Sequence, residues 1–515
     1  MAGSSSSTSV RPLVGAALAA LAGLAAVVVH GRCVTFGFTG LDDRDLVVDD
    51  APFLSAPGSM LRAFTRSYMH VVDRSHGYYR PLVTASFALD ARWSGQHPWG
   101  YHATNVALHA AASALLFVLL RELAPGPWPA LGGAVLFAVH PALASAVAWI
   151  PGRNDSLLAV FALTAWIAFA RDAASPSNGW RAAHLAAFAL ALLTKETAVV
   201  IPLVCLAHVV LVRPRVPRQD SPSSPRERGL GGEILVYAAG WTAALGAFAA
   251  LHAGLHAAAL RVTAQSAKVL VASAGQILLP LAPTAFTSAE DLSVWPGLLA
   301  IGVLTVVSLR VQGVRGRVVA LGATVFVLTL APTLVLGGAT ALDCRLELPA
   351  CGLFLAVVEV ARARWRSRSA AEPGVVTAIG ATAIAVCAVV TIAFEGSFRD
   401  PRSFAKQAVD DAPHSALAHV CLGRVLQADG DVDRAAAEYR TALSLGPAEI
   451  AHNNLAVIAM SGGRWSEAER ELRSEIDLQP AYARAYENLA IVLRSEGRLG
   501  ESRAAQARAD ALSAP

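Results

Sequence analysis

The sequence predicts an all-α protein in which a polytopic membrane helical bundle is followed by a C-terminal α-solenoid. Two observations predict the bundle: 55% of the 515 residues are hydrophobic and only 16% are charged, against roughly a quarter in soluble domains. A sequence repeat near the C-terminus, where the composition becomes that of a soluble protein, predicts the solenoid. We divide the chain into a membrane part at 1–394, a linker helix at 395–415 and the repeats at 416–515.

The membrane part contains eleven apolar segments that are candidates for transmembrane helices. A helix needs about 20 mostly apolar residues to cross a bilayer. The predicted spans are 12–31, 101–121, 129–150, 156–171, 181–194, 197–212, 233–255, 294–309, 318–338, 347–361 and 374–394. The first span is similar to a signal peptide. No small-x-small cleavage site precedes the acidic loop that follows it at 32–78, so we interpret this span as retained. Because Pro280 and Pro283 interrupt the segment 268–283, we predict a re-entrant or surface-lying helix there.

Three clusters of arginine orient the predicted spans. They lie within 213–228, 310–317 and 362–368, and basic loops stay on the cytoplasmic side of a membrane. Eleven spans then put the N-terminus inside, and put the loop 32–78 and everything after residue 394 outside. The short loops and the alanine- and arginine-rich composition favour a bacterial cytoplasmic (inner) membrane, and an endoplasmic reticulum membrane is the alternative.

The C-terminal part repeats a pattern of small residues and a glycine. The pattern recurs after 33 and then 34 residues, in the pairs Leu422-Gly423, Leu455-Ala456 and Leu489-Ala490 and at Gly430, Gly463 and Gly497. This period is typical of tetratricopeptide repeats (TPRs), each of which is a pair of antiparallel helices. We predict three repeats, at 416–447, 449–480 and 483–515. Such a solenoid binds protein segments and indicates no chemistry of its own.

Composition and cysteine spacing exclude several classes of partner. The net charge is +4 and no basic stripe with interleaved aromatic residues is present, so nucleic acid is not an expected partner. The six cysteines show no CxxC spacing, so no zinc or redox motif is expected. We interpret Cys344 and Cys351 as two unpaired residues, and a disulfide is the alternative if their loop faces an oxidising compartment.

Ionisable side chains gather at the predicted outer ends of the spans, where burial in a membrane makes them costly. They are Asp42, Asp43, Arg80, His102, His140, Arg153, Lys195 and Arg345. Each has a simpler structural interpretation, such as a hydrogen bond between helices or a salt-bridged turn. Because these residues are predicted to lie at the same face of the membrane, we favour a functional site. Arginine and lysine bind phosphate, and an ionised aspartate can act as a general base.

Six stretches of the membrane part occur in an order that is typical of one enzyme family. Between about residues 36 and 360 they read LDDRDLVVDD, YYRPLVTASFALD, GYHATNVALHA, LFAVHPALASAVAWIPGRND, TKETAVVIPL and DCRLELPACGL. The chain thereby resembles the GT-C superfamily of membrane glycosyltransferases. It is most similar to the branch that fuses a multispan domain to tetratricopeptide repeats, the transmembrane and TPR-containing protein O-mannosyltransferases and their bacterial relatives.

The resemblance implies a GT-C-like fold for the membrane part and a catalytic aspartate in the first outer loop, either Asp42 or Asp43. This base would deprotonate an acceptor hydroxyl on the non-cytoplasmic face, and the hydroxyl would attack a sugar linked through phosphate to a polyprenol, with inversion. The implied contacts with the donor phosphate are Arg80, Arg153, Lys195 and Arg345. His102 and His140 would orient the donor or the loop, and the repeats would hold an acceptor protein or peptide. No metal-ligand set is apparent beyond Asp42, Asp43 and Asp45, so the sequence assigns no divalent metal.

Two of the stretches depart from the family's pattern. Ser145 stands where the family usually has a glutamate after the His-Pro pair, and Asp343 and Glu347 replace a common Glu and Tyr. The departures leave two functions to be distinguished: a lipid-phosphate-sugar-dependent hexosyltransferase, and a non-catalytic membrane-anchored TPR scaffold for protein–protein interaction. A transporter is disfavoured, because its site would lie near the bilayer midplane and the charged groups here share one face.

Overall fold

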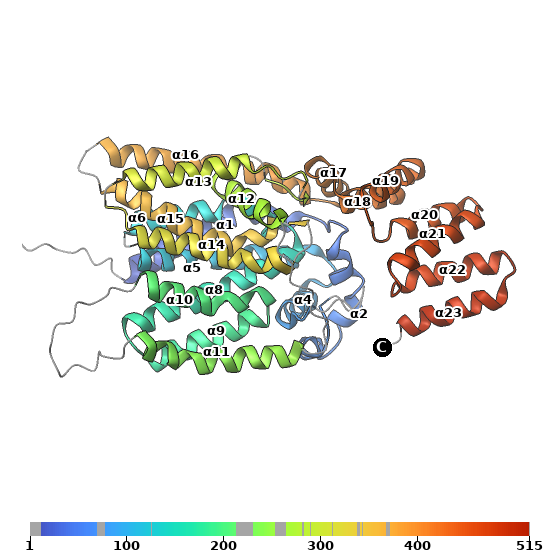
Figure 1. Cartoon of the computed structure of the whole chain (residues 1–515), viewed down its shortest axis with the longest axis horizontal. Coiled ribbons are helices and arrows are strands. Elements are labelled where there is room, and N and C mark those ends of the chain that lie inside the picture. The colour runs from blue at the N-terminus through green and yellow to red at the C-terminus, as the bar shows by residue number, and fades with distance from the viewer. Residues whose placement is uncertain are drawn as a thin grey trace, which may run out of the picture.

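The computed structural model describes residues 12–68, 78–124, 126–212, 230–252, 264–280, 283–288, 290–311, 313–336, 340–341, 343–366 and 371–513. This part is helical apart from one two-residue antiparallel pairing between β1 (Thr287–Ser288) and β2 (Thr340–Ala341). In Figure 1 the membrane helices lie side by side along the long axis, and the C-terminal helices lie beyond one end of them. The predicted all-α class and the membrane bundle followed by a solenoid are confirmed.

The helices of the bundle overlap the predicted spans, and the predicted span 129–150 is interrupted after Ala138. They are α1 (Pro12–His30), α5 (Pro98–Leu123), α6 (Pro127–Ala138), α8 (Arg153–Ala174), α9 (Asn178–Leu192), α10 (Ile201–Leu211), α11 (Leu230–His252), α13 (Trp295–Arg310), α14 (Gly316–Leu336), α15 (Glu347–Trp365) and α16 (Ala371–Glu395). Short helical turns follow α1, before the next long helix: η1 (Gly31–Thr35), η2 (Arg44–Val48), α2 (Ala51–Leu54), α3 (Ser59–Arg62) and η3 (Ala63–Thr65). The next helix, α4 (Pro81–Ser94), lies with α2 at the end of the bundle that faces the solenoid (Figure 1).

The predicted number of eleven spans is not confirmed. Five of the described helices are by themselves long and apolar enough to cross a membrane, and they begin at Leu13, Pro98, Ile150, Gly316 and Gly374. A sixth span is possible if α6 and the following segment Pro141–Ala148 are counted together, although they are bent by 53° at the break between them. The chain is therefore a multi-pass membrane protein in which several apolar helices are shorter than a full span.

The segment for which we predicted no full crossing forms the helix α12 (Ala264–Leu278), which ends just before Pro280. Its 15 residues have a length of about 22 Å, which is less than the hydrocarbon thickness of about 30 Å. The length of α12 agrees with a helix that does not cross the bilayer alone.

Two of the predicted cytoplasmic arginine clusters meet at one buried carboxylate. Arg315 Nη2 lies 2.9 Å from Glu359 Oε2, and Arg362 Nε lies 2.9 Å from the same oxygen. Glu359 is fully buried in α15. The contact places the second and third arginine clusters at the same end of the bundle, as the predicted topology requires.

Glycine allows α14 and α15 to approach closely. A Cβ on Gly322 would lie 2.4 Å from the Gly352 carbonyl oxygen, and a Cβ on Gly352 would meet the Gly322 oxygen at the same distance. Small residues at such crossings let membrane helices gain van der Waals contact along their backbones. In the same helix Cys351 is buried and free, and the side chain of Cys344 lies outside the described residues.

The C-terminal helices form three antiparallel pairs, as predicted. They are α18 (Ala416–Ala428) with α19 (Val432–Leu445), α20 (Ala451–Ser461) with α21 (Trp465–Leu478), and α22 (Ala483–Ser495) with α23 (Leu499–Ser513). A Cβ on Gly423 would lie 2.6 Å from the Tyr439 ring, so this repeat needs glycine where its two helices cross. The turns within the pairs contain Gly430, Gly463 and Gly497, with φ of +83°, +71° and +79°, a conformation that glycine adopts without strain.

The solenoid is attached through α17 (Pro401–Asp411) to the end of the bundle that carries Asp42 and Asp43. The ring of Phe404 in this helix lies 5.6 Å from the Phe286 ring, and both side chains are buried. The Ala285 amide donates a hydrogen bond to Asp411 Oδ2 at 2.6 Å, and the Gly37 amide donates to the Arg399 carbonyl at 2.8 Å. Helix α17, which leads into the first repeat, is therefore held against the bundle and beside the loop that carries Asp42 and Asp43.

The connection between α17 and the first repeat contains an ion pair that responds to pH. His414 Nδ1 lies 2.6 Å from Asp291 Oδ1, and Asp291 raises the pKa of His414 above its ordinary value of about 6.5. A raised folded-state pKa stabilises the docked state fully below the unfolded pKa, and this contribution is lost as the pH rises through the folded pKa. We expect amide protection factors around Ala412–Ala418 to be higher at about pH 6 than at about pH 8.5, in hydrogen exchange corrected for the intrinsic rate. Asp291→Asn should remove the difference, and an identical pH profile in this variant would contradict the role of the pair.

Candidate functional site

The acidic loop is folded around the carboxylate of Asp43. Its side chain is buried and accepts hydrogen bonds from the Thr39 amide at 2.5 Å, the Thr39 hydroxyl at 3.0 Å and the Gly40 amide at 3.0 Å. Burial raises the pKa of Asp43 to about 6, although these hydrogen bonds oppose the rise. Asp43 therefore holds the turn that begins at Thr39, with its oxygens already engaged.

The neighbouring carboxylate of Asp42 is in a different environment. The residue is partly exposed, and no hydrogen-bond or ion-pair partner engages its oxygens among the residues that the structure describes. Burial by the surrounding protein and the charges of Asp45 and Asp43 raise its pKa to about 7, whereas Arg80 and Arg345 lower it. A carboxylate with a pKa near neutrality and unengaged oxygens suits a general base.

Two of the predicted cations act directly on Asp42. Arg80 is partly buried and forms a bidentate ion pair with Glu196, with Nε–Oε2 and Nη2–Oε1 distances of 3.0 and 2.5 Å. Arg345, in η7 (Asp343–Leu346), is partly buried and has no hydrogen-bond or ion-pair partner within the described ranges. Since a half-buried guanidinium without a partner is costly, Arg345 is the cation best suited to a bound anion.

The other two predicted cations are engaged by buried protein groups. Arg153 is fully buried, with its Nη2 2.5 Å from Asp90 Oδ2 and 2.7 Å from the Tyr101 carbonyl, and its Nε donates to Asn105 Oδ1 at 2.9 Å. Lys195 Nζ lies 2.7 Å from both carboxylate oxygens of Asp155. These contacts join α4, α5, α8 and Lys195, the residue before η6 (Glu196–Val200), at the end of the bundle that carries the acidic loop.

The two predicted histidines lie at the edges of this arrangement. His102 Nε2 lies 3.3 Å from the Gly37 carbonyl at the start of the acidic loop, and its Nδ1 has no partner among the described residues. His140 lies at the break after α6, where its Nδ1 accepts a hydrogen bond from the Ala142 amide at 3.3 Å and caps η4 (Pro141–Leu143). His102 therefore contacts the loop, and His140 stabilises the bend.

Glu347, one of the positions that depart from the family's pattern, belongs to a buried hydrogen-bond network. Its Oε1 lies 2.8 Å from His109 Nδ1, and its Oε2 accepts a hydrogen bond from Ser156 Oγ at 2.6 Å. His30 pairs in the same way with Glu395 at 2.5 Å, and the Nε2 atoms of both histidines reach the Ala138 carbonyl, at 3.0 Å from His30 and 3.3 Å from His109. The network joins α1, α5, α15 and α16. The sequence contained all of these residues but gave no signal for their pairing, because they lie as much as 365 residues apart.

Sequence reasoning also missed Tyr68 and Asn154. The Tyr68 hydroxyl accepts a hydrogen bond from Asn154 Nδ2 at 3.1 Å, and the Arg80 guanidinium lies 5.3 Å from the centre of the Tyr68 ring. Burial raises the pKa of Tyr68, and the charge of Asp42 adds to the rise. A tyrosine within an acidic outer loop is the sequence signal that identifies such a residue.

The acidic loop does not form a metal site in the described part of the chain. No group of three or more histidine, cysteine, aspartate or glutamate side chains is arranged to hold a metal ion there. Asp42, Asp43 and Asp45 therefore do not constitute a ligand set in this conformation.

The fold and the site define a class of protein: a multi-pass membrane protein with an acidic loop and cations at one end of its bundle, under a docked TPR solenoid. The family described as "Dolichyl-phosphate-mannose-protein mannosyltransferase" matches residues 80–222, and the "Tetratricopeptide repeat" family matches 402–450, 422–476 and 453–515. The predicted resemblance is therefore confirmed for the bundle and for the repeats. The acidic loop precedes the matched part of the bundle.

Among individual proteins, the chain is 35% identical over 192 residues to Protein O-mannosyl-transferase Tmtc1 of Drosophila melanogaster, which is 36% of this chain and 22% of that protein. It is 32% identical over 144 residues to human Protein O-mannosyl-transferase TMTC3, covering 27% of this chain and 16% of the relative. It is 41% identical over 96 residues to mouse Protein O-mannosyl-transferase TMTC2, covering 18% of this chain and 11% of the relative. The chain thus spans about a fifth or less of the length of these relatives, all of which are named as glycosyltransferases.

Proposed function

We propose that the chain is a membrane protein O-mannosyltransferase that uses a polyprenyl-phosphate-linked sugar and glycosylates protein hydroxyls on the non-cytoplasmic face. The observation that carries the proposal is the partly exposed Asp42 carboxylate, which has no partner among the described residues and lies in the field of Arg80 and Arg345. The names of the relatives and of the matched family support the choice of mannose and of a lipid-linked donor.

In the proposed reaction, Asp42 accepts the proton of a serine or threonine hydroxyl. The hydroxyl oxygen attacks the anomeric carbon as the bond from that carbon to the phosphate oxygen breaks, so the configuration inverts. The lipid phosphate leaves with the additional negative charge, which Arg345 and Arg80 stabilise. Arg153 and Lys195 are assigned a positioning role, because their protein partners already occupy them. His102 orients the acidic loop through Gly37.

The proposal is tested by transfer of radiolabelled mannose from polyprenyl-phosphate mannose into protein, in membranes that contain or lack the chain. We expect chain-dependent label that is released by β-elimination, since the linkage would be to serine or threonine. The alternative function, a non-catalytic TPR scaffold, predicts no chain-dependent transfer from any lipid-linked sugar. From the predicted orientation of the spans, we also expect the labelled acceptor residue and the solenoid to lie on the same side of the membrane.

Replacing Arg345 by glutamine is expected to lower kcat/KM for the lipid donor by about 10- to 100-fold. The reason is the loss of a charge-assisted hydrogen bond to phosphate, worth about 1.5–3 kcal/mol. The measurement is initial rate against donor concentration at saturating acceptor. Arg440→Gln, at an exposed arginine of α19, is the control with the same chemical change and should leave the rate unaltered. Unchanged donor kinetics in Arg345→Gln would remove Arg345 from the site.

A further inference from the structure

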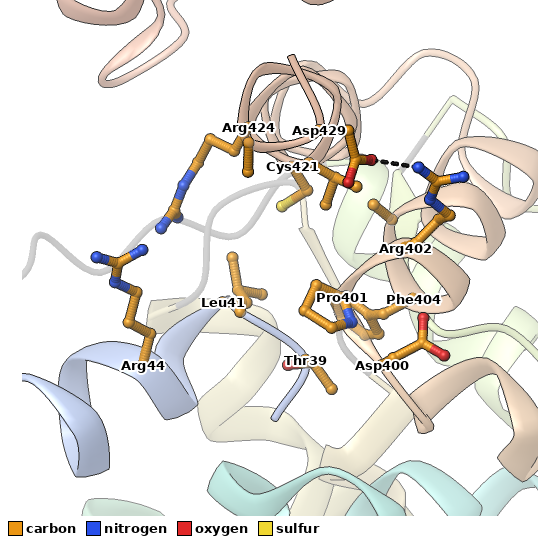
Figure 2. A pocket seen from close by; sticks show the side chains of 14 residues that line it. Thr39, Leu41, Arg44, Asp400, Pro401, Arg402, Phe404, Cys421, Arg424 and Asp429 are labelled. Atoms are coloured by element: carbon orange, nitrogen blue, oxygen red, sulfur yellow. Dashed lines mark hydrogen bonds and ion pairs between the residues drawn. The ribbon is translucent and has the colours of Figure 1, made fainter. Parts of the chain in front are cut away.

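A cavity of about 460 Å³ lies between the acidic loop and the start of the solenoid (Figure 2). Its walls come from three segments that are distant in sequence. The loop contributes Leu41 and Arg44, α17 contributes Pro401 and Phe404, and α18 contributes Arg424 and Val425. The volume falls in the range of cavities that bind small ligands or a few residues of a chain.

The cavity adjoins the proposed base. Leu41 and Arg44 line it, and Asp42 and Asp43 lie between them in the same turn. Asp42 itself experiences the charges of Arg80 and Arg345 on the bundle side. Consecutive Cα atoms are about 3.8 Å apart, so a polypeptide that leaves the cavity past Leu41 reaches Asp42 within one or two residues.

Two arginine side chains approach one another on one side of the cavity. Figure 2 shows the side chains of Arg44 and Arg424 pointing toward one another from the loop and from α18. Arg424 is partly buried and has no hydrogen-bond or ion-pair partner within the described residues, although its charge opposes the rise that burial causes in the pKa of Asp45. Arg44 Nε is 3.7 Å from Asp49 Oδ2. On the other side, Arg402 is paired with Asp429 at 2.5 Å. A partly buried guanidinium without a partner favours a ligand that brings a carboxylate.

The rest of the wall combines apolar and polar groups. Leu41, Pro401, Phe404 and Val425 offer hydrophobic contact, and Thr39 and Asp400 are polar. The wall is held in place on one side, because Phe404 packs on Phe286 of the bundle. A groove that combines hydrophobic contacts with two cations at one side suits an extended peptide that has one acidic side chain.

We propose that this cavity binds the acceptor polypeptide beside its hydroxyl residue, and that Arg424 and Arg44 select an acceptor with an aspartate or glutamate at that place. The proposal rests on the proposed function and specifies its acceptor class. The first repeat thereby contributes directly to substrate choice, through α18.

The test uses the purified full-length chain in detergent and fluorescent peptides that contain one threonine among neutral residues. In one set a single aspartate occupies each of the four positions on either side of the threonine, and in matched sets asparagine or lysine replaces it. Fluorescence polarisation without any sugar donor measures binding. We expect at least one aspartate peptide to bind about tenfold more tightly than its lysine counterpart, which corresponds to one favourable charge contact.

Three variants locate the binding. Arg424→Ala should abolish the preference for aspartate, and Val425→Trp, which fills the cavity without changing charge, should weaken binding of all peptides. Arg440→Ala, at an exposed arginine of the same repeat, should change neither. Equal binding of the acidic, neutral and basic sets, or an equal effect of Arg424→Ala and Arg440→Ala, would overturn the proposal.

The design separates this inference from the proposed function. Charge-selective binding without sugar transfer would contradict the transferase and leave the groove in place. Sugar transfer with no preference for acidic acceptors, unaffected by Val425→Trp, would contradict the groove and leave the transferase in place.

Discussion

Asp42→Asn is expected to lower sugar transfer by about two to four orders of magnitude, which is the usual contribution of a general base. The amide keeps the size of the side chain but cannot accept the proton of the acceptor hydroxyl. The measurement is mannose transfer in membranes that contain matched amounts of protein. Asp433→Asn, at an exposed aspartate of α19, controls for the chemical change and should have full activity.

The pH profile adds a second readout for Asp42. Its pKa, raised to about 7, means that the carboxylate is protonated below neutrality and ionised above it. Transfer by the wild-type chain should therefore rise as the pH increases through about 7, and the residual activity of Asp42→Asn should lack this rise. A wild-type rate that is flat through neutral pH would contradict the assignment of the base.

Asp43 distinguishes catalysis from folding of the loop. Because its carboxylate accepts three hydrogen bonds from Thr39 and Gly40, Asp43→Asn should loosen the turn and increase hydrogen exchange there. If Asp43→Asn were inactive with a normally protected loop, while Asp42→Asn remained active, Asp43 would be the base instead.

The sequence predicted the elements better than it predicted their contacts. The repeats follow from local chemistry: Gly423 faces Tyr439, and glycines with positive φ close the turns. The apolar runs likewise predicted where helices occur. The number of helices that cross the membrane was harder to predict. Helix α6 ends at Ala138 and the chain bends at Pro141, and hydropathy averaged over a window does not detect such a bend.

In the candidate site, too, the sequence predicted the residues better than it predicted their contacts. That these charged residues gather at one end of the bundle was predictable from the arginine clusters and from the resemblance. The sequence could not predict which of the cations is free to bind a ligand, because this depends on partners from other helices. Asp90 of α4 engages Arg153, Asp155 of α8 engages Lys195, and Arg345 has no such partner among the described residues. Long-range pairing of this kind leaves no periodic trace in a single sequence.

Arg153→Met is expected to lower the free energy of unfolding by about 3–5 kcal/mol. The arginine and Asp90 are both buried, at 0% and 1% exposure of their side chains, so removal of one partner leaves an uncompensated charge in the interior. The hydrogen bond from Thr104 Oγ1 to Asp90 Oδ1, at 2.7 Å, cannot replace the lost cation. Denaturant unfolding of the detergent-solubilised protein measures the change.

The control and the double variant make this prediction specific. Arg473→Met removes an arginine whose partner, Glu469, lies on the solenoid surface, and exposed pairs are worth about 1 kcal/mol or less. Asp90→Leu combined with Arg153→Met should recover most of the lost stability, since an apolar pair can replace a buried ion pair. If Arg153 instead gripped the donor phosphate, Arg153→Met would leave unfolding unchanged and raise the KM for the lipid donor. The two roles thus predict opposite pairs of results. The structure favours the structural role, because the guanidinium lies against Asp90 and all three of its nitrogens already donate to or contact protein groups, with Nε on Asn105, Nη1 on Ser86 and Nη2 on Tyr101.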